Sequence, residues 1–130
     1  MYEVFKMEKG LVTKTDEIQD NVWINMIRPT EEEIAEISLR LDIEKSVIAA
    51  SLDDEEESRI EMEVDYSLIL IDAPAVEIRN QREEYTTYPL SIIITPNAVV
   101  TVSLYDFRSI RSIIENKKYE IGRASCRERV

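Results

Sequence analysis

The sequence contains no histidine, one cysteine and two glycines. Without histidine, it lacks the commonest general base and the commonest transition-metal ligand. Cys126 alone cannot form an internal disulfide, which is typical of a chain from a reducing, cytoplasmic compartment. Gly10 and Gly122 stand too far apart for a glycine-rich phosphate loop, and no histidine-based catalytic set is possible. These absences predict a protein that is not an enzyme.

Basic residues are also scarce. The chain has 16 Lys and Arg against 27 Asp and Glu, which gives a net charge of −11. Nucleic acid is an unfavourable partner, because phosphate binding needs clusters of Lys and Arg. An anionic lipid surface is disfavoured for the same reason. A surplus of carboxylates suits a protein that meets cations, although acidic surfaces often serve only solubility.

The length and composition are those of one globular domain. The chain has 130 residues, of which 44% are hydrophobic and 33% charged, and this length suffices to bury a core. No signal peptide is expected, because the first ten residues carry four charges where an apolar segment would be needed. The uncharged stretch 86–105 is about as long as a membrane span. Its prolines, threonines and serines predict a pair of strands instead.

The N-terminal part predicts strands. Tyr2–Met7 and Gly10–Lys14 are two short strands joined by a turn, and a polar loop follows them. Val22–Ile27 is a mostly apolar run, which is typical of an interior strand with both faces covered. It contains Trp23, the only tryptophan of the chain.

Two helices are expected next. Thr30 is the predicted N-cap, and Glu33 completes a capping box in which side chain and backbone satisfy each other reciprocally. Apolar residues recur three and seven positions after Ile34, so this helix has one apolar face and ends near Asp42. A second, shorter helix is predicted over residues 44–51.

The remainder predicts mainly strands. Residues 59–65 alternate strictly, which indicates a half-exposed strand with Ile60, Met62 and Val64 facing inward. An apolar strand follows and is expected to end at Pro74.

A charged stretch, a hairpin and a helix complete the pattern. Residues 76–84 are interpreted as a loop or an edge strand, and 90–95 with 98–103 form a hairpin around a Pro-Asn turn. Asp106 caps a final helix. This order of elements predicts an α/β fold with a mixed β-sheet flanked by helices.

The last eleven residues break with this pattern. Glu120–Val130 has no hydrophobic period and reads like the translation of a sequencing adapter. We therefore expect the natural domain to be residues 1–119 and exclude 120–130 from fold reasoning. Cys126 then belongs to the adapter, and the natural protein is expected to continue past Tyr119.

Acidic residues gather in three places. Asp53–Glu57 offers carboxylates of the kind that Mg²⁺ and Ca²⁺ prefer, but it lacks the spacing and glycine of an EF-hand loop. A solvated loop is the simpler interpretation, and cation binding is the alternative. Glu31–Glu33 complements the helix dipole. Asp16, Glu17 and Asp20 form a further acidic group without an indicated role.

The aromatic residues give no firm site. Trp23 is interpreted as a core residue rather than a stacking platform, because its neighbours are apolar. Tyr85 and Tyr88 either face a partner or are ordinary sheet residues. No catalytic or cofactor-binding residue is assigned, and the metal ligands are left open.

Several short motifs occur in a characteristic order between Val22 and Leu104. They are Trp23-Ile24-Asn25, Pro29-Thr30 with Glu33-Ile34, Leu52-Asp53, Arg59 before Ile60-Glu61, Tyr66 before an aliphatic strand, and the hairpin Leu90–Thr101. In this order and spacing they resemble the N-terminal cytosolic domain of CorA-type magnesium transporters.

The resemblance implies a homopentameric channel for Mg²⁺ or another divalent cation. In this family the cytosolic domains lie at the membrane's cytoplasmic face and respond to Mg²⁺ bound between identical subunits. That cation offsets carboxylate repulsion and holds the pentamer closed, and its loss lets the domains separate. The family's stalk helix, two membrane spans and Gly-Met-Asn motif are absent from this sequence. A soluble fragment is therefore expected, which contacts the membrane only through the missing spans.

One departure concerns the family's regulatory site. Its acidic pair at the end of the second helix aligns with Ala49 and Ala50, so that site is not carried over. The nearby run Asp53–Glu57 is a hypothetical substitute. Two alternatives stay open: a free-standing soluble cation-sensing or protein-interaction domain of the same fold, and a metal-assisted hydrolase that uses carboxylates.

Overall fold

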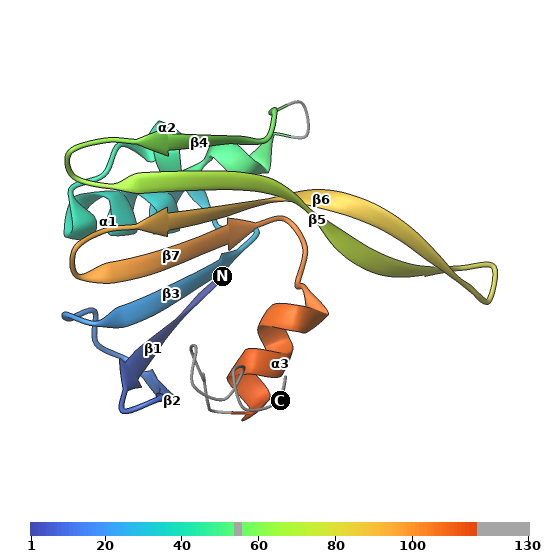
Figure 1. The fold of residues 1–130 in the computed structure, drawn as a ribbon, viewed down its shortest axis with the longest axis horizontal. Coiled ribbons are helices and arrows are strands. Elements are labelled where there is room, and N and C mark those ends of the chain that lie inside the picture. Colours follow the sequence, from blue (N-terminus) through green and yellow to red (C-terminus); the bar gives the residue numbers. More distant parts are fainter. Residues whose placement is uncertain (54–55, 117–130) are drawn as a thin grey trace, which may run out of the picture.

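The computed structural model describes residues 1–53 and 56–116, and these residues form a single seven-stranded sheet with helices on both faces (Figure 1). The strand order is β2-β1-β3-β7-β6-β5-β4. The strands are β1 (Tyr2–Glu8), β2 (Leu11–Thr15), β3 (Val22–Ile27), β4 (Arg59–Met62), β5 (Ser67–Arg79), β6 (Arg82–Ile94) and β7 (Ala98–Ser103). The helices are α1 (Glu31–Leu41), α2 (Lys45–Ile48), the 3-10 turn η1 (Ala50–Leu52) and α3 (Arg108–Asn116).

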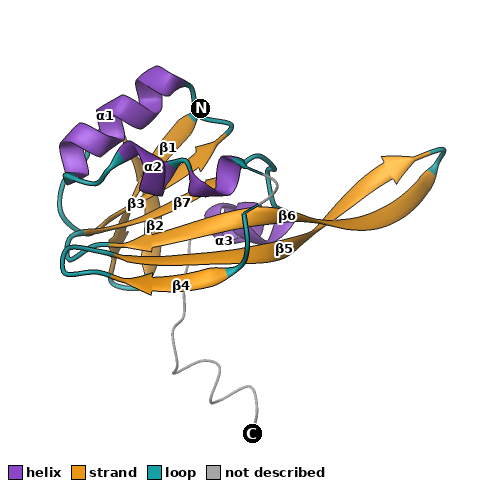
Figure 2. Cartoon of the chain, turned by 90° about the horizontal axis from the view of Figure 1, so that it is seen from above, coloured by secondary structure: helices purple, strands orange, loops and turns teal. Residues whose placement is uncertain are grey.

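The sheet is mixed. Strand β3 pairs in parallel with β7, whereas the other neighbouring strands pair antiparallel. One face packs against α1, α2 and η1, and the other packs in part against α3 (Figure 2). All six residues of β3 are buried, as expected of a strand covered on both faces. The predicted α/β fold with a mixed, helix-flanked sheet is therefore confirmed.

Helix α1 begins with the predicted capping box. The Glu33 amide donates to Thr30 Oγ1 at 3.1 Å, and the Thr30 amide donates to Glu33 Oε1 at 2.9 Å. The Met1 ammonium donates to the same carboxylate at 2.6 Å. Burial by itself raises the pKa of Glu33, but these bonds to its charged form outweigh burial and lower that pKa. The helix ends at Asp42, as predicted, with this residue in the left-handed conformation.

A buried hydrogen-bond chain lies between β3 and β7. The Trp23 indole Nε1 donates to Thr101 Oγ1 at 2.9 Å, and the Thr101 hydroxyl donates to Asn25 Oδ1 at 2.8 Å. Phe5 packs on Trp23 with ring centroids 5.2 Å apart. Trp23 is thus a core residue, as predicted from its apolar neighbours.

The predicted second helix is interrupted. Residues 44–51 form a single turn of α-helix, α2, followed by the tighter turn η1. Ser51 explains part of the change, because its hydroxyl is fully buried and donates to the Val102 carbonyl at 2.7 Å. This bond draws the end of the segment onto β7.

The prediction that Pro74 ends its strand is wrong. Strand β5 continues through Pro74 to Arg79 and pairs with β6 along its whole length. Strand β4 pairs only with residues 67–70 of β5, so Pro74 lies where β5 has become an edge strand. Proline is tolerated at such an edge because no ladder bond on that side needs its amide. Residues 76–84 are therefore part of a two-stranded arm that extends beyond the sheet (Figure 1).

The predicted facing of residues 59–65 is also wrong. Strand β4 ends at Met62, and the side chains of Ile60, Met62 and Val64 are 69%, 80% and 99% exposed. Arg59 and Glu61 pair with Leu70 and Leu68, which face α1 and α2, so the charged residues point toward that side. The predicted alternation is correct. However, β4 is an edge strand, and its charged residues rather than its apolar residues face the side covered by α1 and α2.

The C-terminal part follows the predicted order. Strands β6 and β7 form the expected hairpin, and among the described residues no helix is long and apolar enough to cross a membrane. Helix α3 buries Ile110 beside Phe107, while Ile113 is 43% exposed. Residues 120–130, which we predict to be translated adapter sequence, lie outside the described residues, so both this origin and the domain boundary at residue 119 stay predictions.

The buried hydrogen-bond chain gives a stability prediction. Thr101→Val removes the shared hydroxyl and leaves Trp23 Nε1 and Asn25 Oδ1 without it, and each buried polar group left unpaired costs about 1–3 kcal/mol. We expect urea denaturation to show a loss of about 2–4 kcal/mol. Thr13→Val, the same change at an exposed position of β2, should alter stability by less than about 0.5 kcal/mol. Equal stability of the two variants would contradict the structural role of this chain.

Candidate functional site

The described residues of the acidic run lie between η1 and β4 and belong to no helix or strand, as predicted for a loop. Of its five residues the structure describes Asp53, Glu56 and Glu57. Arg59 Nη1 lies 2.6 Å from Glu56 Oε2, and Arg59 Nε lies 3.2 Å from Glu61 Oε1. The hydrogen bond that Arg59 donates to Glu56 is the largest of the effects that raise the pKa of the Arg59 guanidinium. Glu56 is therefore already engaged with a cation of its own chain.

The described carboxylates do not form a metal site within one chain. No group of three or more His, Cys, Asp or Glu side chains close enough to hold a metal ion occurs in residues 1–53 and 56–116. Magnesium requires nearly octahedral oxygen ligands, often with retained waters. A regulatory Mg²⁺ held by a single chain consequently does not fit these residues.

Ala49 and Ala50 occupy the place where the family resemblance implies an acidic pair. Ala49 is the C-cap of α2, and Ala50 is 6% exposed and packs in the core. A methyl group cannot ligate a cation. The hollow beside Ala49, of about 530 Å³, has the ionisable groups of Glu31 and Lys45 on its walls. One carboxylate next to one amine is a poor cation site.

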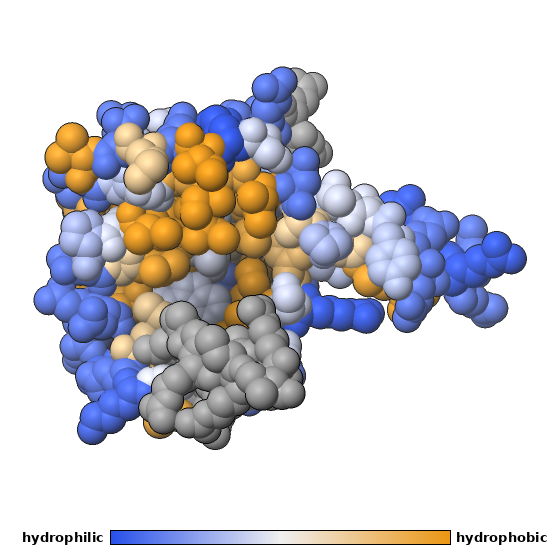
Figure 3. Space-filling view, in the orientation of Figure 1, coloured by the Kyte–Doolittle hydropathy of each residue, from blue (hydrophilic) through white to orange (hydrophobic). Residues whose placement is uncertain are grey.

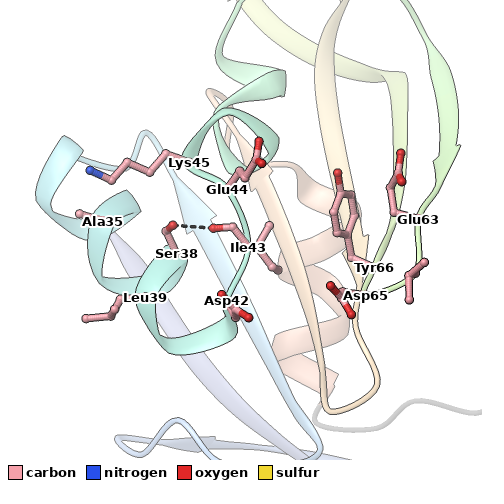
Figure 4. A pocket seen from close by; sticks show the side chains of 11 residues that line it. Ala35, Ser38, Leu39, Asp42, Ile43, Glu44, Lys45, Glu63, Asp65 and Tyr66 are labelled. Carbon is pink, nitrogen blue, oxygen red and sulfur yellow. Dashed lines mark hydrogen bonds between the residues drawn. The ribbon is translucent and has the colours of Figure 1, made fainter.

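A second hollow, of about 950 Å³, lies between the end of α1 and the turn that joins β4 to β5 (Figure 4). Its apolar lining comes from Ala35, Leu39, Ile43 and Val64, and its acidic lining from Asp42, Glu44, Glu63 and Asp65. We call it the acidic crevice. These four carboxylates form no group in the sequence, because two lie near residue 43 and two near residue 64.

The backbone geometry at the end of α1 places Asp42 and Glu44 at the acidic crevice. Asp42 adopts φ 55° and ψ 49°, and its amide donates to the Ser38 carbonyl, which ends α1. The Ser38 hydroxyl donates to the Ile43 carbonyl and fixes the connection to α2 (Figure 4). On the opposite wall the Glu63 amide donates to the Tyr66 carbonyl at 2.9 Å and closes the β4–β5 turn.

The pKa of Tyr66 reflects the negative electrostatic potential of the acidic crevice. Burial raises the pKa of its hydroxyl first, and the charges of Glu63, Glu61 and Glu44 raise it further. Lys45 is the one basic residue that lines the hollow. The crevice thus disfavours anions and favours cationic groups, without forming a ligand set for a metal ion.

The two candidate tyrosines lie in different environments. Tyr85 is 77% exposed on the two-stranded arm. Tyr88 stacks on Tyr105 with centroids 5.0 Å apart, and the Tyr105 hydroxyl donates to the Val76 carbonyl at 2.8 Å. Tyr88 therefore fastens the base of the arm to the segment before α3, whereas Tyr85 points its side chain into solvent on the arm.

Comparison with known families decides the assignment. A sequence model of the family described as CorA-like Mg²⁺ transporter protein matches residues 19–128. The chain belongs to this family. It is 31% identical over 103 residues to the cobalt/magnesium transport protein CorA of Methanocaldococcus jannaschii, which covers 77% of this chain and 31% of that protein.

Solved structures agree. The soluble domain of CorA from Methanocaldococcus jannaschii matches with a TM-score of 0.72 and 28% identity, over 94% of this chain and 49% of that one. The ZntB cytoplasmic domain from Vibrio parahaemolyticus RIMD 2210633 matches with a TM-score of 0.67 at 17% identity, over 95% of this chain and 53% of that one, and shows the fold alone. The chain thus has the CorA soluble-domain fold and spans about half of that domain.

The potential of the acidic crevice can be measured through Tyr66. In Glu63→Gln we expect the pKa of Tyr66 to fall but stay above its ordinary value, because burial remains. The measurement is a tyrosinate absorbance titration, with a Tyr66→Phe counterpart subtracted for each variant. Glu31→Gln, at the other end of α1, should leave this pKa unchanged.

The same pKa has a consequence for stability. Because folding raises the pKa of Tyr66, the protonated hydroxyl favours the folded state. This contribution to the free energy of unfolding is complete below the ordinary tyrosine pKa of about 10 and is lost as the pH rises through the higher pKa of the folded state. A Tyr66 pKa that does not respond to Glu63→Gln would contradict the assigned electrostatics.

Proposed function

We propose that this chain is the cytosolic regulatory domain of a CorA-type transporter for Mg²⁺ or another divalent cation. The observation that carries the proposal is the match to the CorA soluble domain over 94% of this chain at 28% identity. The chain spans 31% of the length of its curated CorA relative, so most of such a transporter lies outside it. In this proposal the membrane-crossing part belongs to that remainder, and the subunits assemble as a homopentamer.

The proposed role of this domain is to gate the channel in response to cation. Its net charge of −11 means that neighbouring copies repel one another. Because one chain does not provide a ligand set among its described residues, carboxylates from two neighbours would have to share a cation. The candidates are Asp53 and Glu57, the other described carboxylates of the acidic run. A cation shared by the loops of two neighbouring subunits would favour the closed pentamer. Without that cation, repulsion between the acidic domains would favour their separation.

The gene gives the direct test of the transporter assignment. We expect the DNA past the codon for Tyr119 to encode a long charged helix, two apolar spans of about 20 residues each and a Gly-Met-Asn motif. A natural stop codon soon after this position would overturn the channel proposal and leave a free-standing domain of the CorA fold.

Magnesium should stabilise the domain if the loop carboxylates bind it. Binding to the folded state alone adds about 1.4 kcal/mol when the free Mg²⁺ concentration is ten times Kd. We expect the melting temperature to rise with MgCl₂, and this rise to disappear in the double variant Asp53→Asn, Glu57→Gln. The measurement is thermal denaturation at constant ionic strength, over a range of protein concentrations that reveals any assembly.

A matched control separates binding from charge screening. Asp16→Asn with Asp20→Asn removes the same number of charges from a loop that precedes β3. This control should retain the full effect of Mg²⁺. A melting temperature that responds equally in the two double variants would show a nonspecific effect and remove the loop from the proposal.

A further inference from the structure

The two-stranded arm has no third strand beside it in the part of the chain that the structure describes. Strand β4 pairs with β5 only as far as Leu70, and β7 pairs with β6 only from Leu90 onward. Residues 72–79 and 82–89 therefore pair with each other alone. Figure 3 shows the outer part of this arm projecting from the body of the domain. A ribbon of two strands is marginally stable by itself in water, so contacts at its base decide how the arm is held.

The turn at the tip of the arm does not hold it in place. Asn80 and Gln81 have positive φ angles of 50° and 65°, as the tight turn of a two-residue hairpin requires. Glycine suits the second position of such a turn, whereas the Cβ of Gln81 makes this conformation strained. The order of the arm must therefore come from its base.

One residue at the base contacts both strands of the arm. The Tyr105 ring stacks on Tyr88 of β6, with centroids 5.0 Å apart and an interplanar angle of 6°. The Tyr105 hydroxyl donates to the Val76 carbonyl of β5 at 2.8 Å. Ring stacking and hydrogen bonding both depend on orientation. The two contacts together therefore fix the direction of the arm.

The same residue is held by the start of α3. Phe107 packs edge-on against the Tyr105 ring, with centroids 5.1 Å apart. Phe107 is buried, and its carbonyl accepts the Arg111 amide at 3.0 Å. The Ser103 hydroxyl donates to the Tyr105 carbonyl at 2.7 Å. We call the row of Tyr88, Tyr105 and Phe107 the aromatic bridge, because it joins the arm to α3 without a gap.

Helix α3 is docked on the sheet by contacts made away from the arm. Ile110 belongs to the same buried cluster as Phe5 of β1. Arg111 Nη1 lies 3.3 Å from Glu3 Oε1, also on β1. Strands β3 and β7 lie between β1 and the β5–β6 pair. The position of α3 is thus set at one side of the sheet, whereas the arm extends from the other.

We propose that the aromatic bridge couples the arm to α3, so that the arm keeps its direction only while α3 is docked on the sheet. Displacement of α3 withdraws Phe107 and Tyr105 from the base of the arm and releases it. A load on the arm weakens the docking of α3 in turn, because a coupling free energy acts equally in both directions. The exposed side chains of the arm, Ile78 and Tyr85, are thereby positioned by α3. This inference goes beyond the proposed function, since it concerns contacts within this chain alone.

Hydrogen exchange in the 130-residue chain tests the coupling. Amides of the arm exchange through local opening, so a variant that lowers only the global stability leaves their rates unchanged. In Ile110→Ala, which weakens the docking of α3, we expect the amides of residues 75–79 and 82–86 to exchange at least about fivefold faster. Ile37→Ala removes the same atoms from the buried side of α1, on the opposite face of the sheet. This matched control should leave the rates of the arm unchanged.

Removal of the central ring tests the bridge itself. In Tyr105→Ala the amides of the arm should exchange faster, and the further change Ile110→Ala should then have no additional effect on them. Tyr88→Ala, on the side of the arm, should speed exchange of the Arg111 amide at the start of α3. A purely structural role of Tyr105 within the arm would not produce this reciprocal effect.

Three results would overturn the proposal. Unchanged rates in Ile110→Ala would show that the arm keeps its direction without α3. Equal acceleration in Ile37→Ala would show a global effect. An effect of Ile110→Ala that persists in Tyr105→Ala would place the coupling outside the aromatic bridge. None of these results bears on the transporter assignment, so the two proposals fail separately.

A second variant covers the case in which Ile110→Ala does not fold. Arg111→Gln removes the ion pairs with Glu3 and Asp106 and leaves the apolar cluster intact. It should speed exchange in the arm in the same way, and this effect should again be absent in the Tyr105→Ala background. Unchanged rates in Arg111→Gln would contradict the coupling.

Discussion

Parallel pairing between β3 and β7 joins segments that lie more than seventy residues apart, and the rest of the structure depends on it. The pair holds the N-terminal hairpin on one side and the long β5–β6 hairpin on the other. The buried side chains of these two strands include polar groups, because Trp23, Thr101 and Asn25 form a buried hydrogen-bond chain. Such bonds contribute modestly when made and cost more when left unpaired, so they favour this one register over slipped alternatives.

The surplus of carboxylates is distributed rather than concentrated. Glu33 serves the start of α1, Glu56 and Glu61 hold Arg59, and others line the acidic crevice. Among residues 1–53 and 56–116, no three of these carboxylates lie close enough together to hold a metal ion.

The two faces of the sheet are covered by helices to different extents. One face packs against α1, α2 and η1, and the other packs in part against Phe107 and Ile110 of the α3 region. The two-stranded arm is the extension of β5 and β6 beyond the sheet (Figure 1). At the base of the arm, Tyr88 stacks on Tyr105, which precedes α3.

The sequence by itself determined the features that depend on neighbouring residues. The capping box of Thr30 and Glu33, the buried run Val22–Ile27 and the hairpin before Ala98 all follow from local periodicity and local hydrogen bonding. The family resemblance of the ordered motifs was also readable from the sequence, and the family match confirms it.

Only the tertiary structure decided the features that depend on position in the sheet. Alternation in residues 59–65 cannot reveal which face is covered, because that depends on the register of β4 against β5. Pro74 was compatible with a continuing strand only because β4 ends before it. The carboxylates of the acidic crevice come from two distant segments, so only chain folding brings them together. Local patterns fix local conformation, whereas burial and charge environment are set by partners far away in the chain.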